Sequence, residues 1–176
     1  IRSLGSRVVN FFLRHASLVR PLNELVKMKL ASDISQLEFA LNEWFASCGM
    51  RLDADIGESY RCFKAFKPLL YLDLAQIPSP HHTGAIPTPI ILHHLFSRAH
   101  PVLPLPTTLH GWSEAQYSEW LDVHSADEAV ALLEQCADAY AEAIRRRGDR
   151  EFCVEYPVVR ALVAASVAAR ARSARE

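Results

Sequence analysis

Apolar residues recur at alternating spacings of four and three over the first 25 residues of the chain. This repeat keeps one side of an α-helix apolar over several turns, so it predicts a helix with a continuous apolar edge. Pro21 interrupts the pattern and is expected to kink or restart the helix near Val19 and Arg20. Arg7, Arg14 and Arg20 are expected to face away from this edge. The apolar seam consists of Leu4, Val8, Phe11, Phe12, His15, Leu18 and Leu22, and Leu25 continues its spacing.

His15 is the one polar member of the seam. A histidine in such a position usually has its ring satisfied by a neighbouring carbonyl or a water molecule, which is the interpretation we favour. A pH switch or a ligand-binding role is the alternative. Its place in the seam also allows it to fix the register of a partner helix.

Two more helical patterns precede position 77. Residues 30 to 48 continue the apolar periodicity up to Gly49, which is expected to end the helix. Ser35 and Glu38 form a possible capping box, unless the helix simply continues from Leu22. A second long helix is predicted from about residue 55 to residue 76, with Pro68 as an internal kink. Joined at residues 49 to 53, the two helices would lie antiparallel and bury their aromatic side chains against each other.

The middle of the chain, residues 77 to 112, is rich in proline. Proline removes a backbone donor and disfavours helix for the residue before it, so this segment is predicted to be a connection between two helical arms. One short helix is expected within it, with Thr88 as the N-cap, Pro89 at the first position and an end near Ala99. The following residues are expected to stay extended up to Gly111. Seven of the ten prolines lie here: Pro78, Pro80, Pro87, Pro89, Pro101, Pro104 and Pro106.

The remaining residues, 113 to 176, show well-marked helix boundaries. Ser113 with Gln116 and Ser125 with Glu128 are predicted capping boxes. The second of these helices is expected to end in three arginines before Gly148, and Pro157 is expected to begin a last helix. No segment alternates like a strand. The predicted fold class is therefore all-α, a multi-helix bundle or rod. Residues 1 to 176 are predicted to form a single domain, divided into an N-terminal helical arm (1–76), the proline-rich connection (77–112) and C-terminal helices (113–176).

Charge and cysteine content exclude some classes of partner. The 19 Lys and Arg residues against 20 Asp and Glu residues give a net charge of −1, so nothing indicates a nucleic-acid partner. The four cysteines are scattered without metal-ligand spacing, as is typical of reduced thiols. No apolar run is long enough to span a bilayer. The chain begins with Ile1 rather than Met and enters a helical pattern at once, so we expect a fragment of a longer protein.

Catalytic motifs are missing, and we expect no catalytic residue, no metal and no cofactor. The glycines form no phosphate-binding loop and no serine lies in a nucleophile elbow. The acidic pairs at positions 53 and 55 and at 127 and 128 are expected to cap helices. A histidine-dependent metal enzyme remains an alternative, because six histidines lie close together in the sequence. They are expected in solvated loops or on a solvated helix face, since adjacent histidines on a helix point about 100° apart. The six are His81, His82, His93, His94, His100 and His110.

A second alternative is a helical module that binds anionic lipid. Arg145 to Arg147 and Arg150 form a basic run that a phosphoinositide could use. The negative end of the helix dipole also attracts cations at this position, and this accounts for the run without a ligand. Both interpretations remain open at the level of the sequence.

Several stretches go beyond generic helix and resemble, in order along the chain, the C-terminal half of the fifth subunit of the conserved oligomeric Golgi complex. The loop from Ile77 to His82 and the tail from Ala164 look individual to this sequence. The stretches that resemble the family are Arg14 to Leu22, Lys27 with Met28, Tyr60 to Leu70, Gly84 to Pro87, Leu95 to Ala99, Trp112 with Ser113, Tyr117 to Asp122, Glu151 with Phe152, and Tyr156 with Pro157.

This resemblance implies a scaffold without turnover, similar to the rod-like helical bundles of vesicle-tethering complexes. It implies pairing with the seventh subunit, contact with other subunits of the complex, and a role in retrograde intra-Golgi transport. Small GTPases and membrane-fusion proteins are further candidate partners. The implied location is the cytosolic face of the Golgi, with only indirect membrane association. We expect the seam, Leu4 to Leu22, to form the partner interface.

Overall fold

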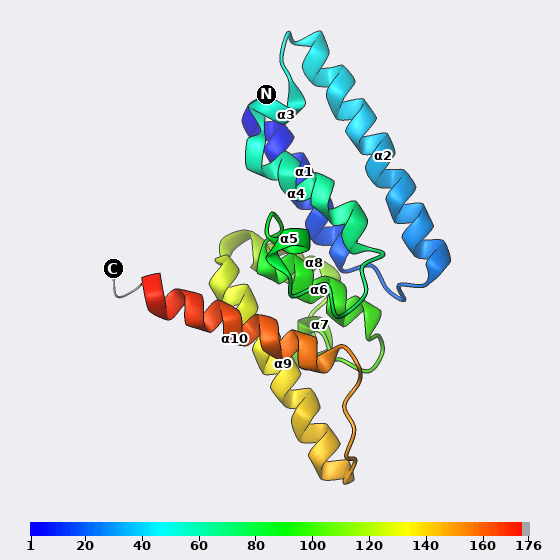
Figure 1. The fold of residues 1–176 in the computed structure, drawn as a ribbon, viewed down its shortest axis with the longest axis vertical. Helices are drawn as coiled ribbons and strands as arrows, with labels where there is room; N and C mark the ends of the chain where they lie inside the picture. Colours follow the sequence, from blue (N-terminus) through cyan, green and yellow to red (C-terminus); the bar gives the residue numbers. More distant parts are fainter. Residues whose placement is uncertain (174–176) are drawn as a thin grey trace.

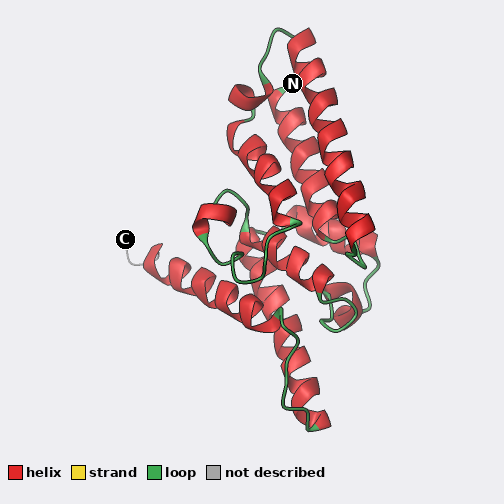
Figure 2. Ribbon diagram, turned by 45° about the vertical axis from the view of Figure 1, so that its right-hand side comes forward, coloured by secondary structure: helices red, strands yellow, loops and turns green. Residues whose placement is uncertain are grey.

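The computed structural model describes residues 1–173, and within that range the chain forms ten helices and no strand. The predicted all-α fold class is confirmed. Figures 1 and 2 show an elongated molecule with three long N-terminal helices side by side at one end. The helices are α1 (Arg2–Ser17), α2 (Glu24–Ser47), α3 (Leu52–Asp55), α4 (Gly57–Leu69), α5 (Pro80–Thr83), α6 (Thr88–Arg98), α7 (Pro106–His110), α8 (Glu114–Val123), α9 (Ala126–Arg147) and α10 (Tyr156–Ser173).

The break at Pro21 is where the sequence predicts it. α1 ends at Ser17, and α2 begins after Asn23, whose side chain accepts a hydrogen bond from the amide of Val26. α2 then runs without interruption. Of the two alternatives for Ser35, the uninterrupted helix is the one found and the capping box does not form, because the Ser35 hydroxyl donates to the carbonyl of Ala31 within α2.

The turn after α2 depends on a glycine. Gly49 has a φ of 69°, a left-handed conformation that only glycine adopts without strain, and the predicted helix end there is confirmed. The next long helix is shorter than predicted, because α4 ends at Leu69 rather than near Gln76. Pro68 lies in its last turn and not at an internal kink. The following amides, of Tyr71 and Leu72, bond to carbonyls three residues back, which is the tight geometry that ends a helix.

The proline-rich segment is more ordered than predicted. It holds three helices, and α7 occupies residues that were expected to be extended up to Gly111. Pro106 starts α7 because proline at the first helical position sacrifices no hydrogen bond. The predicted short helix is confirmed as α6, but Thr88 does not cap it; the N-cap is Pro87 and no side chain bonds there.

α6 lies in the middle of the molecule, packed against α1, α9 and α10 (Figure 1). Leu92, Leu95 and Phe96 on this helix are fully buried. The segment predicted to be a connection between two helical arms therefore supplies the centre of the core. The main buried apolar cluster runs continuously from α1 to α10, and a smaller one of Tyr117, Leu121, Ala129 and Leu132 lies beneath α8. The single-domain organisation stays a prediction.

The C-terminal helix boundaries agree with the sequence. Both capping boxes form, at Ser113 with Gln116 and at Ser125 with Glu128. α9 ends at Gly148, which has a φ of 75°. α10 begins one residue before Pro157 and packs along α9, where Arg160 lies 2.7 Å from a carboxylate oxygen of Asp138.

Candidate partner interface

α1 carries two apolar faces. The buried one consists of Gly5, Val9, Leu13 and Ala16 and packs into the core. The seam lies on the other side, where Leu4 is 55% exposed and Phe11 is 57% exposed. Because each residue turns an α-helix by about 100°, residues 4 and 11 lie on one side of α1 and residues 9 and 13 lie on the opposite side. The core can therefore be complete while a row of large apolar side chains remains uncovered.

The exposed seam borders an open apolar groove between α1 and α2, with a volume of about 610 Å³. Leu37 of α2 contributes from across the groove. Arg7 also lines it, so the prediction that Arg7 faces away from the seam is wrong. Its position three residues after Leu4 and four before Phe11 already places it beside them on a helix. The lining residues are Leu4, Arg7, Val8, Phe11, Phe12, His15 and Leu37.

Two members of the seam lie elsewhere. Leu18 and Leu22 follow the end of α1 and are half-buried against the main core cluster, and Leu18 also contacts the smaller cluster. Neither lines the groove. The structure thus brings Leu4, Val8, Phe11, Phe12 and His15 together and separates Leu18 and Leu22 from them.

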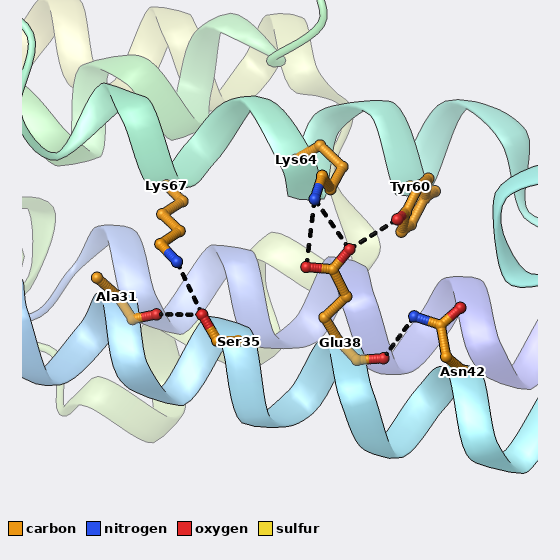
Figure 3. A network of polar contacts seen from close by, with 7 residues as sticks. All are labelled: Ala31, Ser35, Glu38, Asn42, Tyr60, Lys64 and Lys67. Atoms are coloured by element: carbon orange, nitrogen blue, oxygen red, sulfur yellow. Dashed lines mark hydrogen bonds and ion pairs between the residues drawn. The ribbon is translucent and has the colours of Figure 1, made fainter.

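A polar network joins α2 to α4, as Figure 3 shows, beside the buried apolar residues of α2. The carboxylate of Glu38 accepts hydrogen bonds from the Tyr60 hydroxyl at 2.7 Å and from Lys64 Nζ at 3.0 Å. One turn earlier on α2, Lys67 Nζ donates to the Ser35 hydroxyl at 2.8 Å. These pairs run antiparallel, as the sequence predicts for the two helices. Leu37, which lines the groove and packs on the main core cluster, is the chain neighbour of Glu38.

The electrostatics of this network favour an ionised Glu38. Burial raises the pKa of Glu38, but the hydrogen bonds from Tyr60 and Lys64 outweigh it and hold that pKa below its ordinary value. The hydrogen bond that the Tyr60 hydroxyl donates to Glu38 also raises the pKa of Tyr60, to about 12. The carboxylate therefore stays charged and the phenol stays protonated at neutral pH, so the bond between α2 and α4 is charge-assisted.

A close contact brings α1 against α2 near the start of α1. A Cβ atom placed on Gly5 would lie 2.6 Å from Cζ of Phe45, whose side chain is fully buried. Only glycine allows this approach. The close approach of α1 to α2 at this point thus depends on Gly5.

His15 is anchored from outside the seam. Its Nε2 lies 3.1 Å from the Ser118 hydroxyl of α8, and its ring centroid lies 4.2 Å from that of Phe11. The ring of His15 thus has a hydrogen-bond partner, a hydroxyl rather than the expected carbonyl or water, and its role in an interface stays a prediction. Nearby ion pairs of Arg14 with Asp122 and of Arg20 with Glu114 also join the α1 end to α8. These contacts tie the C-terminal end of α1 to α8.

Two of the six clustered histidines are buried rather than solvated. His93 and His94 are almost completely buried in α6, and the expectation of a solvated helix face is wrong for both. Burial lowers their pKa to about 3, and the positive charges of Arg14 and Arg98 act in the same direction, so both rings are neutral. α6 is central rather than peripheral, which local periodicity could not reveal. His81 and His82 are exposed as expected, on the short α5.

The other candidate residues, which are metal donors, the basic run and the acidic pairs, form no binding site within residues 1–173. Across residues 1–173, no three His, Cys, Asp or Glu side chains come together as metal donors. Arg145 and Arg146 both pair with Glu142, which offsets part of the charge that a lipid headgroup would need. Asp55 accepts from the backbone amide of Arg51, as expected of a residue that caps a helix start. The described helices include none that is both long and apolar enough to cross a bilayer.

Curated relatives cover nearly the whole chain. It is 38% identical over 158 residues, 90% of its length, to conserved oligomeric Golgi complex subunit 5 of Arabidopsis thaliana. It is 36% identical over 159 residues to the mouse protein of the same name, and 26% identical over 159 residues to that of Drosophila melanogaster. The chain spans 18% to 20% of the length of these relatives. No family model and no solved structure matches it. Because these relatives share one name and match the chain almost from end to end, the chain belongs to the conserved oligomeric Golgi complex subunit 5 family, as a segment of about a fifth of its relatives' length.

Proposed function

We propose that this chain is a segment of a non-catalytic scaffold subunit in a Golgi vesicle-tethering complex, and that the groove between α1 and α2 receives another subunit. The family membership supports the first part. The seventh subunit is the partner we propose. The same proposal includes a role in retrograde transport and a peripheral position on the cytosolic face of the Golgi. It also includes contacts with other subunits of the complex, and small GTPases and fusion proteins as further partners.

One observation carries the choice of surface. Leu4 and Phe11 are more than half exposed and line an apolar groove on α1. Contiguous exposed apolar surface of this kind is typical of interaction sites. Burying such side chains against a partner is favourable by about 25 cal/mol for each Å² of apolar area removed from water.

The first test is whether the pair forms at all. The chain would be mixed with the seventh subunit and examined by sedimentation velocity. A species that sediments faster than either component is expected. A Phe39→Glu variant serves as control, because Phe39 is 69% exposed on α2 yet does not line the groove. If the two proteins sediment independently at micromolar concentrations, the proposed pairing is wrong.

A double substitution that places charges in the seam must avoid Leu18. That residue packs against both buried clusters, so a charge there would disturb folding as well as any interface. Leu4 and Phe11 are exposed, and charged residues at these positions leave the core intact. Loss of pairing by these variants would report on the groove alone.

A further inference from the structure

We propose that the occupant of the groove is a single amphipathic α-helix of the partner, about three turns long, that lies nearly parallel or antiparallel to α1 and presents a carboxylate to Arg7. This inference rests on the proposed function and specifies the chemistry of the partner.

The spacing of the exposed residues sets the crossing angle. Leu4 and Phe11 are seven residues apart, and so are Val8 and His15, all of which line the groove. A seven-residue repeat stays in contact with a second helix only when the two axes cross at a shallow angle of about 20°. The seam from Leu4 to His15 is about 17 Å long at 1.5 Å per residue, which corresponds to three turns of a partner.

The backbone of the walls favours a helix over a strand. Both walls are α-helices, whose interior amide and carbonyl groups are already bonded within the helix. An extended peptide in the groove would find no edge with which to pair its own backbone groups. A helix satisfies its backbone internally and needs only apolar side chains at spacings of three and four to fill the groove.

Charge selects the polar edge of that helix. Arg7 is exposed and lines the groove, whose other lining residues include no carboxylate. The other two arginines of α1 are already paired, Arg2 with Asp55 and Arg14 with Asp122, whereas no carboxylate among residues 1–173 lies within 4.0 Å of Arg7. An acidic residue beside the apolar stripe of the partner would complement Arg7.

The same charge argues against a second copy of this chain as the occupant. In a two-fold symmetric dimer the groove would face its own copy, and the Arg7 residues of both copies would lie in the same apolar interface. Two arginines would then approach each other with no acidic residue of the groove to separate them. A partner of different sequence avoids this repulsion.

Two measurements on the complex with the seventh subunit test the inference. The first replaces Phe11 by a photoreactive residue, Phe11→p-benzoylphenylalanine, and maps the cross-linked positions in the partner; Phe39→p-benzoylphenylalanine is the matched control. The second compares the affinities of Arg7→Glu and Arg150→Glu, since Arg150 is also exposed and lacks a carboxylate within 4.0 Å in the described part of the chain.

We expect cross-links at positions three, four or seven residues apart in one partner segment, from position 11 only. Arg7→Glu should weaken binding about tenfold and remove part of its salt dependence, while Arg150→Glu should leave both unchanged. Replacing the acidic residue next to the cross-linked positions by arginine should restore binding to Arg7→Glu.

The two measurements distinguish a failure of the acidic-helix inference from a failure of the proposed interface. If Phe11→Glu abolishes pairing but Arg7→Glu does not weaken it, the groove is the interface and the acidic helix is wrong. Cross-links to consecutive residues of the partner, or to a second copy of this chain, would also overturn the inference. If neither Phe11→Glu nor Arg7→Glu affects pairing, the proposed interface itself is wrong.

Discussion

The Nε2 atom of His93 lies 2.7 Å from the hydroxyl oxygen of Tyr117, and both side chains are buried. This bond joins α6, at the centre of the main core, to α8, which covers the smaller cluster. Burial lowers the pKa of His93 to about 3 and raises that of Tyr117. Both groups are therefore neutral at pH 7, and the hydrogen bond between them is the only one that either ring makes in residues 1–173.

Tyr117→Phe should destabilise the fold. The substitution keeps the ring but leaves the buried Nε2 of His93 without a partner, which costs about 1–3 kcal/mol. We expect a lower midpoint in urea at unchanged slope. Tyr71→Phe is the control, because Tyr71 is half exposed and its hydroxyl makes no hydrogen bond within the described residues. Equal midpoints for the two variants would show that the His93 contact contributes nothing.

Stability should fall as the pH drops below the ordinary histidine range. The pKa of buried His94 is about 3, against 6.5 when it is exposed. Between these values the unfolded chain binds a proton that the folded chain cannot bind. The contribution of neutral His94 to the free energy of unfolding is therefore complete above about pH 6.5. It falls by about 1.4 kcal/mol per pH unit as the pH approaches 3.

His94→Leu removes this proton uptake. We expect the slope of unfolding free energy against pH, measured between pH 6 and 4, to decrease by about 1.4 kcal/mol per unit. The exposed His82 provides the matched variant His82→Leu, for which the slope should not change. A decrease of the same size in both variants would contradict burial as the cause.

Gly5→Ala should lower the melting temperature although alanine favours helix. The gain in helix propensity is about 1 kcal/mol, whereas forcing an extra carbon into a packed core costs about 1–3 kcal/mol. The new Cβ would lie 2.6 Å from the buried ring of Phe45. Ser3→Ala, at an exposed position of the same helix, should not destabilise. A higher melting temperature for Gly5→Ala would mean that α1 can move away from Phe45 at little cost.

Glu38→Ala should loosen α2. It removes the acceptor for Tyr60 and Lys64, at a cost of about 1–2 kcal/mol. Hydrogen exchange of the α2 amides around Leu37 should become faster, because this helix is held to α4 by that network. Glu43→Ala, an exposed carboxylate on α2 without an ion pair in the described chain, should leave exchange unchanged. Equal exchange in both variants would remove the proposed role of Glu38.

The sequence predicts the parts of this fold that depend on local chemistry. Each of these features is decided by a few neighbouring residues, and each is confirmed. They are the capping boxes at Ser113 and Ser125, the glycine ends at Gly49 and Gly148, and the break at Pro21. The end of α4 differs from the sequence prediction because nothing in the local apolar pattern after Pro68 marks the turn at Tyr71.

Burial within the tertiary structure could not be predicted in the same way. A pair of histidines on a short helix between prolines is polar by composition, yet His93 and His94 lie inside because α1, α9 and α10 cover α6. The apolar seam was identified from its spacing, but spacing alone cannot tell a core face from an exposed one. The second apolar face of α1, through Val9 and Leu13, is what leaves the seam uncovered.

The affinity of the Leu4→Glu/Phe11→Glu double variant for the seventh subunit tests the proposed interface most directly. Truncating or charging such anchors typically costs about 2 kcal/mol or more, so binding should weaken at least about 30-fold. The melting temperature should match that of the unmodified chain, because both side chains are more than half exposed. Phe39→Glu should bind normally. A double variant that is folded and binds with unchanged affinity would contradict the groove between α1 and α2 as the site of pairing.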